Sequence, residues 1–378
     1  MLPTVREINE IGELAALRGA WTALLAETPG ASFFQSLDWL ESYWSHFGAS
    51  QRLRVLVVQA GDQPLGFLPL VIRTRGRMGL LRVLTYPLDD WGSFYGPIGA
   101  DASVILQAGL DHVRRTERDW DLIELPWVDA VGSDRGRTRQ AMHDAGLGAF
   151  VERGQDIALV DLAGSGDWQG YWSSRTSRWR NNVRRSEKKL AQHGEVSYLR
   201  FRPIEGEAQD PHWDLYDECE RIAAASWQGS SSTGTTLSHA EIRPFLRDCH
   251  QRAAAVGAVD LNLLSVDGRA VAFNYAYHYA GYVFGLRTGY DATAGCQGAG
   301  SVLQARMIED CFARGDRAYD LGPGYAECKR YWQTEIRFGY RYTHFPSHVP
   351  IAQLVRAKRS MRRLLRGRRL TVVGSTSS

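Results

Sequence analysis

Residues 282–332 read YVFGLRTGYDATAGCQGAGSVLQARMIEDCFARGDRAYDLGPGYAECKRYW, and the order of elements in this stretch decides the fold. The stretch opens as an apolar strand and continues through a loop of small residues. A helix is expected after Ser301, with apolar side chains at helical spacing, and Gly315 is expected to end it. Residues 318–321 have the pattern of another strand. This order predicts an α/β fold with a mixed sheet.

The loop before this helix suits an anionic group. A glycine-rich turn that opens a helix presents free N–H groups and the positive end of the helix dipole. Glycine is needed there because a Cβ would hold the anion away from the backbone. The run is not a Walker loop, and it is not a Rossmann fingerprint because position 303 is Leu. The candidate residues for binding the anion are Gly298, Ala299, Gly300 and Ser301; an ordinary helix cap at Ser301 is the alternative.

A strand–turn–strand unit occurs twice in the chain. LRVLVVQAGDQPLGFLPLVIR begins at Leu53, and DLNLLSVDGRAVAFNYAYHY begins at Asp260 with Asp267-Gly268 as its turn. Each copy follows a helical region and precedes further strands and a helix, which favours two related domains. The flexible run AGSGDWQG marks the boundary between them. We expect an N-terminal domain at 1–165, a C-terminal domain at 166–350 and a basic tail at 351–378.

The composition excludes several classes of protein. Of the 378 residues, 44% are hydrophobic and 23% are charged, as in a globular protein, and the net charge is only +3. No apolar run approaches the ~18 residues of a membrane span, and the N-terminus lacks the apolar core of a secretory signal, so a cytoplasmic protein is expected. The five cysteines form no CxxC pair, which favours free thiols and no metal site. Nothing indicates a DNA partner.

A series of landmarks carries a family resemblance: Tyr290-Asp291, Gly300 with the helix after it, residues 320–324 (DLGPG) and Lys329. The series resembles the tandem-GNAT, Fem-like acetyltransferases of bacterial envelope and exopolysaccharide biosynthesis, the CelD-like branch. Within that family a Tyr-Lys pair usually follows the glycines, whereas Cys328 stands in place of the tyrosine here. RWRNNVRRSEKKL, FFQSLDWLESYW and FYGPIGAD are similar to further landmarks of the family, so the resemblance spans about residues 32–345.

The resemblance implies two tandem GNAT-like domains, each a mixed sheet flanked by helices. Acyl-CoA would bind as co-substrate with its pyrophosphate at residues 298–301, and the acceptor would enter from the domain interface. The first domain lacks a comparable glycine loop, so we expect it to shape the acceptor cleft without binding CoA.

Direct attack of an amine on a thioester needs a base, an acid near the departing thiolate and a positive charge at the oxyanion. The candidates are Asp320 to orient or deprotonate the acceptor, Tyr325 to protonate the thiolate, and Lys329 to stabilise the oxyanion. The alternatives are a turn cap for Asp320, packing for Tyr325 and a solvated surface charge for Lys329.

Other side chains are candidates for contacting the substrate. Arg178 and Trp179 lie on a basic helix expected over residues 173–193, where arginine suits a phosphate and the indole offers a stacking face. A solvated helix face is the alternative. For Arg287, contact with a phosphate and an ion pair with Asp291 are equally open.

The C-terminal tail is arginine-rich, and Met361, Leu364 and Leu365 share one side of the helix expected there. Such a helix suits an anionic membrane surface at the inner face of the membrane. Closely spaced arginines also suit a guanine nucleotide such as cyclic di-GMP. A tail that only aids solubility is the third reading. The candidate contacts are Arg359, Arg362, Arg363 and Arg366.

These readings predict an N-acyltransferase that moves an acetyl group to an amine of an envelope or exopolysaccharide precursor, such as an amino sugar. Two alternatives stay open. One is a Fem-type ligase that uses aminoacyl-tRNA, although residues 211–257 are too short and irregular for its helical arm. The other is a catalytically degenerate GNAT protein that acts as a cyclic di-GMP receptor.

Overall fold

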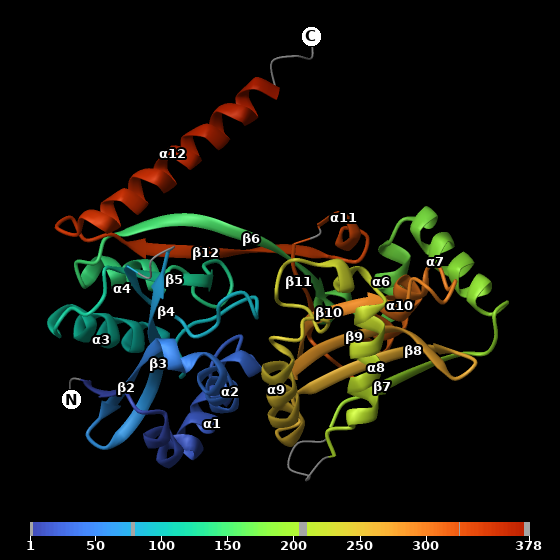
Figure 1. Ribbon diagram of the computed structural model, residues 1–378, viewed down its shortest axis with the longest axis horizontal. Helices are drawn as coiled ribbons and strands as arrows, with labels where there is room; N and C mark the ends of the chain where they lie inside the picture. The colour runs from blue at the N-terminus through green and yellow to red at the C-terminus, as the bar shows by residue number, and fades with distance from the viewer. Residues whose placement is uncertain (1–2, 77–79, 204–209, 325, 374–378) are drawn as a thin grey trace.

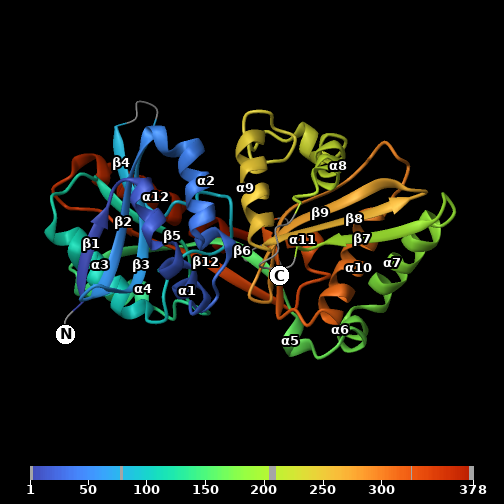
Figure 2. The same cartoon turned by 90° about the horizontal axis from the view of Figure 1, so that it is seen from below.

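The computed structural model describes residues 3–76, 80–203, 210–324 and 326–373 (Figure 1). Its strands form one mixed sheet of 12 strands in the order β1-β2-β3-β4-β5-β12-β6-β11-β10-β9-β8-β7. The two halves of this sheet lie side by side and carry their own helices (Figures 1 and 2). The predicted α/β architecture, with two halves that each have a mixed sheet flanked by helices, is confirmed, and the structure adds that the two sheets are continuous.

The N-terminal half is built around the first predicted hairpin. Strands β2 and β3 are antiparallel and joined at Gly61-Asp62, and their central residues are buried because helices cover them. Its strands are β1 (Thr4–Ile8), β2 (Gln51–Ala60), β3 (Gln63–Arg75), β4 (Leu81–Thr85) and β5 (Leu122–Asp129). Its main helices are α1 (Arg18–Ala26), α2 (Leu37–Phe47), α3 (Ala102–Arg115) and α4 (Arg137–Asp144), with short 3-10 turns at η1 (Ile11–Leu17), η2 (Phe33–Gln35) and η3 (Gly48–Ser50).

The C-terminal half repeats the arrangement around the second predicted hairpin, and Asp267 and Gly268 both take positive φ angles at its turn. Helices α8 and α9 cover one face of its sheet, and α5, α6, α7 and α10 cover the other (Figure 2). Its strands are β7 (Val196–Phe201), β8 (Val259–Val266), β9 (Arg269–Tyr279), β10 (Tyr282–Tyr290) and β11 (Ala318–Pro323). Its helices are α5 (Leu162–Ser165), α6 (Trp168–Ser174), α7 (Ser177–Leu190), α8 (Trp213–Ala224), η4 (Trp227–Ser230), α9 (Arg243–Ala255), α10 (Ala299–Ala313) and α11 (Ala326–Lys329).

Two long strands join the halves. Strand β6 (Ala149–Asp161) pairs with β12 along most of its length and with β11 at its C-terminal end. Strand β12 (Glu335–His344) returns from the C-terminal half and inserts between β5 and β6. Each half therefore uses a strand from the other side of the predicted boundary, and the division at residue 165 stays a prediction.

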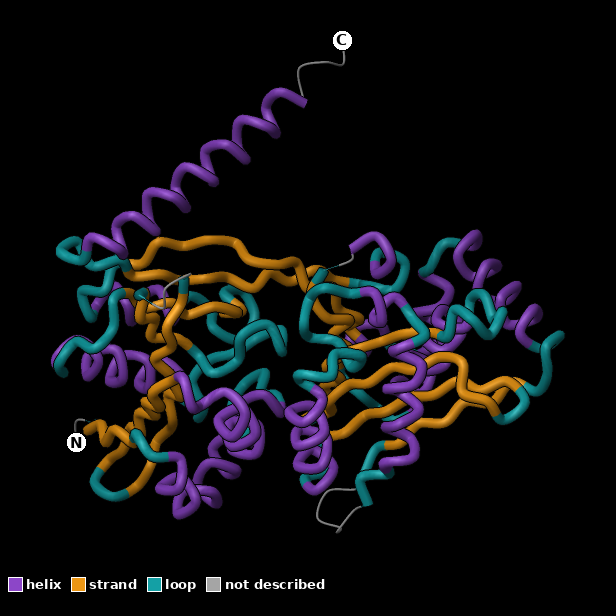
Figure 3. Tube along the Cα trace, in the orientation of Figure 1, coloured by secondary structure: helices purple, strands orange, loops and turns teal. Residues whose placement is uncertain are grey.

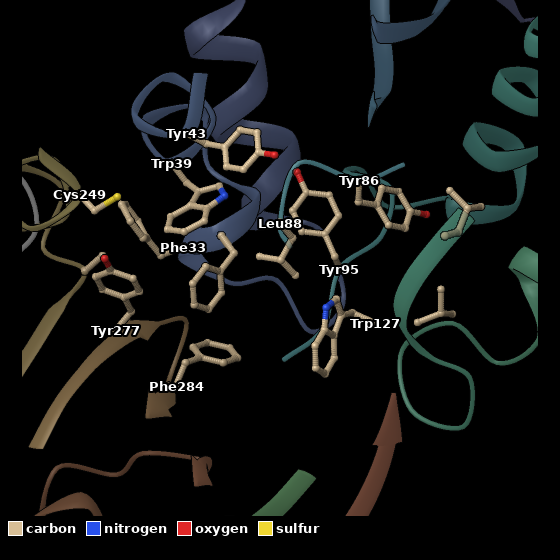
Figure 4. Close-up of a cluster of buried hydrophobic side chains, with 14 of the residues drawn as sticks. Phe33, Trp39, Tyr43, Tyr86, Leu88, Tyr95, Trp127, Cys249, Tyr277 and Phe284 are labelled. Carbon is tan, nitrogen blue, oxygen red and sulfur yellow. The ribbon is translucent and has the colours of Figure 1, made fainter. Parts of the chain in front are cut away.

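An aromatic cluster fills the junction between the halves (Figure 4). The rings of Phe33 and Tyr277 lie 4.5 Å apart, and those of Trp39 and Phe245 lie 5.5 Å apart. An ion pair of 2.6 Å between Arg252 and Glu41 borders the cluster. Because the cluster is buried and joined to the main core, it holds the two halves in one arrangement.

One expected helix is interrupted, whereas the helix expected in the basic tail is present. The single helix expected over residues 173–193 is divided into α6 and α7, because Thr176 adopts an extended conformation and its side chain caps α7. The basic tail forms α12 (Pro350–Val373), which extends away from the body (Figure 3). Within the described residues, no helix is long and apolar enough to span a bilayer.

Candidate active site

The sheet opens between β10 and β11. These parallel strands pair only at Tyr282–Ala318, Val283–Tyr319 and Phe284–Asp320. Beyond Phe284, β10 bulges between Gly285 and Arg287 and continues along β9 alone. A Cβ on Gly285 would lie 2.9 Å from the carbonyl oxygen of Asp320, so glycine permits the close approach where the strands begin to diverge.

Helix α10 begins beside this opening, as its glycine loop predicted. Gly298 has a φ of 91°, and a Cβ there would lie 2.4 Å from Ser186 Oγ of α7. Gly300 is different, since the nearest atom to its Cβ position is 3.7 Å away on the Tyr290 ring. Ala299 is buried in the core, and its N–H donates to the carbonyl oxygen of Cys296 at 3.2 Å. Gly298 therefore sets the packing of two helices, while Gly300 keeps the space before α10 open.

Helix α7 adds positive charge near this helix terminus. Leu190, at the end of α7, packs in one cluster with Ala299, whereas Val183 packs further along α10, so the two helices run in opposite directions. The last turns of α7 carry the exposed side chains of Arg185, Lys188 and Lys189. An anion at the start of α10 would therefore meet backbone N–H groups, the helix dipole and nearby cations.

Asp320 lies at the point where β10 and β11 separate. Its side chain is 3% exposed; Oδ1 accepts a 2.6 Å hydrogen bond from Gly322 N, and Oδ2 has no partner among the described residues. Ser93 of the N-terminal half makes a polar contact with this carboxyl group. Burial raises the pKa of Asp320 to about 6, although Ser93, Gly322 and Lys329 oppose the rise. Asp320 is thus a carboxyl group able to exchange a proton near neutral pH.

Lys329 lies close to Asp320 and braces the turn that follows β11. Its Nζ donates hydrogen bonds of 2.8 and 3.0 Å to the carbonyl oxygens of Gly322 and Pro323. Burial lowers the pKa of Lys329 to about 8, and the charge of Asp320 opposes this change. The two groups form a buried acid–base pair with pKa values on either side of neutrality.

The two substrate candidates on α7 lie apart from Asp320 and Lys329. Tyr325 lies outside the described residues. The Trp179 ring stacks on Tyr331 at 4.5 Å and meets Trp332 edge-on at 5.2 Å, so these rings cover part of its surface. Arg178 is exposed one position earlier. The described structure brings Asp320 and Lys329 together, and α7 lies on the opposite side of the sheet.

Arg287 lies at the β10 bulge and lines a small hollow between the halves. Its Nε donates to the carbonyl of Thr235 at 2.8 Å, and its Nη1 donates to that of Leu286 at 2.6 Å. The suggested ion pair with Asp291 is wrong. That carboxylate instead pairs with Arg221 of α8 at 3.3 Å and with Arg269 of β9 at 2.8 Å.

Sequence reasoning expected the N-terminal half to shape the acceptor cleft but did not identify which of its residues would do so. Phe34 approaches β10 from η2, and Trp91 and Ser93 approach β10 and β11 from the loop after β4. FFQSLDWLESYW, which contains Phe34, and FYGPIGAD resembled family landmarks, but neither resemblance indicated a contact with β11.

The helix of the N-terminal half that corresponds to α10 is capped by an acid. The Asp101 carboxylate accepts hydrogen bonds from Ser103 N at 3.0 Å and Val104 N at 3.1 Å at the start of α3. A negative side chain therefore occupies the N–H groups that would otherwise attract an anion. That the first half does not bind CoA stays a prediction.

The tail residues fall into two groups. Arg359 is bound to the body through ion pairs with Glu124 at 2.5 Å and Glu152 at 3.1 Å, so it fastens α12 to the sheet. Arg362 and Arg363 are exposed, and nothing is described of the Arg366 side chain. An exposed apolar stripe accompanies these cations on α12, formed by Leu354, Met361, Leu364 and Leu365.

The comparisons with known proteins agree with this geometry. Residues 177–330 match the family model described as acetyltransferase (GNAT) domain. FemX is 12% identical, covers 93% of this chain and 99% of its own, and has a TM-score of 0.60. A conserved protein of unknown function from Bacteroides thetaiotaomicron is 12% identical, with 87% and 97% coverage and a TM-score of 0.55.

A third similar structure is the DUF2156 domain of a protein from Agrobacterium fabrum that is named for lysylphosphatidylglycerol synthesis. It is 12% identical, covers 90% of this chain and 94% of its own, and has a TM-score of 0.55. A search of curated protein sequences found no match. At this identity the likenesses show a shared fold. The chain therefore shares its overall fold with FemX, and its residues 177–330 match the acetyltransferase (GNAT) domain.

Proposed function

We propose that the protein is an N-acyltransferase that moves an acyl group, most simply acetyl, from acyl-CoA to an amine. One observation carries the proposal. Asp320 is a buried carboxyl group with an unpartnered oxygen, and it lies where two parallel strands separate beside a glycine-opened helix.

The start of α10 fits the donor. Gly298, Ala299, Gly300 and Ser301 would hold the pyrophosphate of acyl-CoA, and the cations at the end of α7 would add attraction. The backbone donors would be Gly298 and Gly300, because the N–H groups of Ala299 and Ser301 already donate to the carbonyl oxygens of Cys296 and Gly298. Bound acyl-CoA supplies an activated thioester. The space in front of Gly300 is consistent with this role, since no atom lies within 3.7 Å of its Cβ position.

The chain's own residues would manage the protons. Asp320 Oδ2 takes a proton from the acceptor amine, since a carboxyl group with a pKa of about 6 is mostly ionised at neutral pH and still accepts a proton. Lys329 provides positive charge next to the developing oxyanion. Tyr325 stays the candidate for protonating the departing thiolate.

The acceptor is proposed to be an amine-bearing sugar or similar precursor of the cell envelope or an exopolysaccharide. The protein would then work in the cytoplasm, in contact with the inner membrane face through α12. The exposed stripe and cations of α12 suit an anionic membrane surface. Cyclic di-GMP at Arg362 and Arg363 is the alternative ligand of this helix, and through it a regulator of activity.

Calorimetric titration with acetyl-CoA tests the donor site. The Gly300→Trp variant should lose binding, because an indole would fill the open space before α10 without striking the backbone of a neighbour. Arg115→Gln on α3 is the matched control, since this arginine is largely exposed and distant from α10. Failure of the wild type to bind acetyl-CoA, or unchanged binding by Gly300→Trp, would contradict the proposal.

A Fem-type ligase that uses aminoacyl-tRNA is the second candidate, because FemX is similar over 93% of this chain. Helices α8 and α9 count against it, since α8 packs on β9 and α9 packs on α2, with no extended arm between them. Titration with aminoacyl-tRNA and with cyclic di-GMP, beside acetyl-CoA, separates the ligase, the receptor and the acetyltransferase.

A further inference from the structure

Arg287 is a cation whose charge has no carboxylate partner among the described residues. Two of its three nitrogens are bonded to backbone carbonyl groups, those of Thr235 and Leu286. The third nitrogen, Nη2, has no hydrogen bond in the described structure. Asp291, the nearest acid along the strand, is engaged by Arg221 and Arg269. The guanidinium group is therefore oriented by the protein but not neutralised by it.

This arrangement is costly unless a ligand completes it. A cation in a poorly hydrated site is stabilised by an anionic partner or by a loss of charge. Burial lowers the pKa of Arg287 to about 10, opposed only by the neighbouring Tyr277. The side chain still carries its charge at neutral pH, so the uncompensated cation is a property of the folded protein.

The surroundings of Arg287 have the character of a ligand pocket. The cavity is small and open at one side, receives aromatic side chains from both halves and has few polar groups besides this guanidinium. The loop that carries Thr235 covers one side and is itself held by Gln228, which donates to Thr288 O at 3.2 Å. The lining residues that matter most are Phe34, Trp39, Trp91, Tyr275 and Tyr277.

The cavity and Asp320 share one face of the sheet. Phe284 pairs with Asp320 on one side and with Tyr277 on the other, so these three side chains point the same way. That face is turned toward the N-terminal half, as the positions of Phe33, Tyr277 and Phe284 show (Figure 4). Helix α10 covers the opposite face, where Ala276 packs with α10 residues. Donor and acceptor would thus approach the opening in the sheet from opposite sides.

We propose that Arg287 binds an anionic group, a carboxylate or a phosphate, of the acceptor, whose apolar or flat portion lies against the aromatic rings. This inference rests on the proposed function, because it places the acceptor in the cavity next to Asp320. Arg287 selects the acceptor by charge, while Asp320 receives its amine proton. A neutral analogue would leave the guanidinium unpaired. Its binding is therefore weakened by the cost of the unpaired charge as well as by the missing hydrogen bond.

Small aromatic probes test this site without knowledge of the natural acceptor. Benzoate, phenyl phosphate and benzamide share a ring but differ in charge, and each is titrated calorimetrically into the full chain. The proteins are the wild type, Arg287→Gln, Arg287→Lys and the Arg115→Gln control. Retained acetyl-CoA binding and an unchanged melting temperature verify that each variant is folded.

We expect the wild type and Arg115→Gln to bind at least one anionic probe about tenfold or more tighter than benzamide, as a charge-assisted hydrogen bond suggests. Arg287→Gln should lose this preference, and Arg287→Lys should retain only part of it. A preference for benzoate or for phenyl phosphate distinguishes a carboxylate from a phosphate as the natural group.

Equal binding of charged and neutral probes by the wild type, including no binding of any probe up to millimolar concentration, would overturn the inference. Unchanged discrimination in a folded Arg287→Gln would overturn it too. The acetyl-CoA titration separates the two proposals. If acetyl-CoA does not bind but the charge preference persists and needs Arg287, the acyltransferase proposal fails while the anion site stands.

Discussion

At the scale of single residues, Asp320 combines two features that sequence reasoning could not join. Its position after a buried strand suggested a catalytic acid or a turn cap, and the structure gives evidence for both. Oδ1 caps the turn at Gly322, and Oδ2 is unpartnered and buried. Because one oxygen has a structural role, a substitution must preserve that hydrogen bond to test the other.

Asp320→Asn should therefore fold and lose activity, by about a hundredfold or more if Asp320 is the general base. Its effect on stability has a definite sign. The folded pKa of about 6 lies above the ordinary value of 3.8, so the wild type loses stability as pH rises from about 4 to 6. The asparagine variant should be more stable at pH 7.5, by up to about 3 kcal/mol, and equal to the wild type near pH 3.5. Denaturant unfolding at both pH values measures this, and a variant less stable at pH 7.5 would contradict the buried-acid assignment.

The pKa values of Asp320 and Lys329 predict how the rate of acyl transfer depends on pH. The rate should fall below about pH 6 as Asp320 gains a proton, and above about pH 8 as Lys329 loses one. Lys329→Arg keeps its charge to much higher pH, so its alkaline limb should move upward while the acidic limb stays. An alkaline limb that does not move would mean that Lys329 only braces the turn at Gly322 and Pro323.

At the scale of elements, the contact between α7 and α10 depends on one glycine. Gly298 begins α10 with a positive φ and lies directly against Ser186, whereas a Cβ on Gly300 would make only an ordinary contact, at 3.7 Å, with the Tyr290 ring. The two glycines of the same loop therefore have different functions, one in helix packing and one in the proposed donor site.

Gly298→Ala should lower the free energy of unfolding by about 2–4 kcal/mol. The new Cβ would strain the backbone at its positive φ and would also clash with Ser186. Adding Ser186→Gly should recover the packing part and leave the strain. Chemical denaturation of the single and double variants measures the difference. Gly300→Ala is the control, with a change within about 1 kcal/mol; if Gly298→Ala were equally mild, the close packing of α7 on α10 would be wrong.

At the scale of the whole molecule, β6 and β12 make the two halves interdependent. Without β6, strand β11 would keep only β10 as a neighbour and would become an edge strand, and β12 would lose one of its two partners. The buried aromatic cluster adds apolar surface that neither half can cover alone.

A fragment of residues 166–378 should consequently fail to fold as a unit, although it contains the whole matched domain at 177–330. Circular dichroism and limited proteolysis of this fragment, beside the full chain, test the prediction. A fragment that melts cooperatively and binds acetyl-CoA would show that the C-terminal half is independent of β6.

Much of the fold and part of the site were predictable from sequence. The hairpins at Leu53 and Asp260, the glycine loop, α10 and β11 each depend on a few neighbouring residues, so turn chemistry and periodicity reveal them. Asp320 and Lys329 were found because one lies in the strand predicted at residues 318–321 and the other lies shortly after it. Their pKa values were not predictable, because these depend on burial between two halves of the chain.

The sequence by itself determined the local elements and their order, because turns, caps and apolar spacing act over a few residues. Only the tertiary structure decided which strands the two halves share and that Ser93 contacts Asp320. It also decided that Asp291 forms its ion pair with Arg269 and not with Arg287. These features depend on how distant segments dock. Docking is set by the summed packing of many buried side chains, to which no single short motif contributes a recognisable signal.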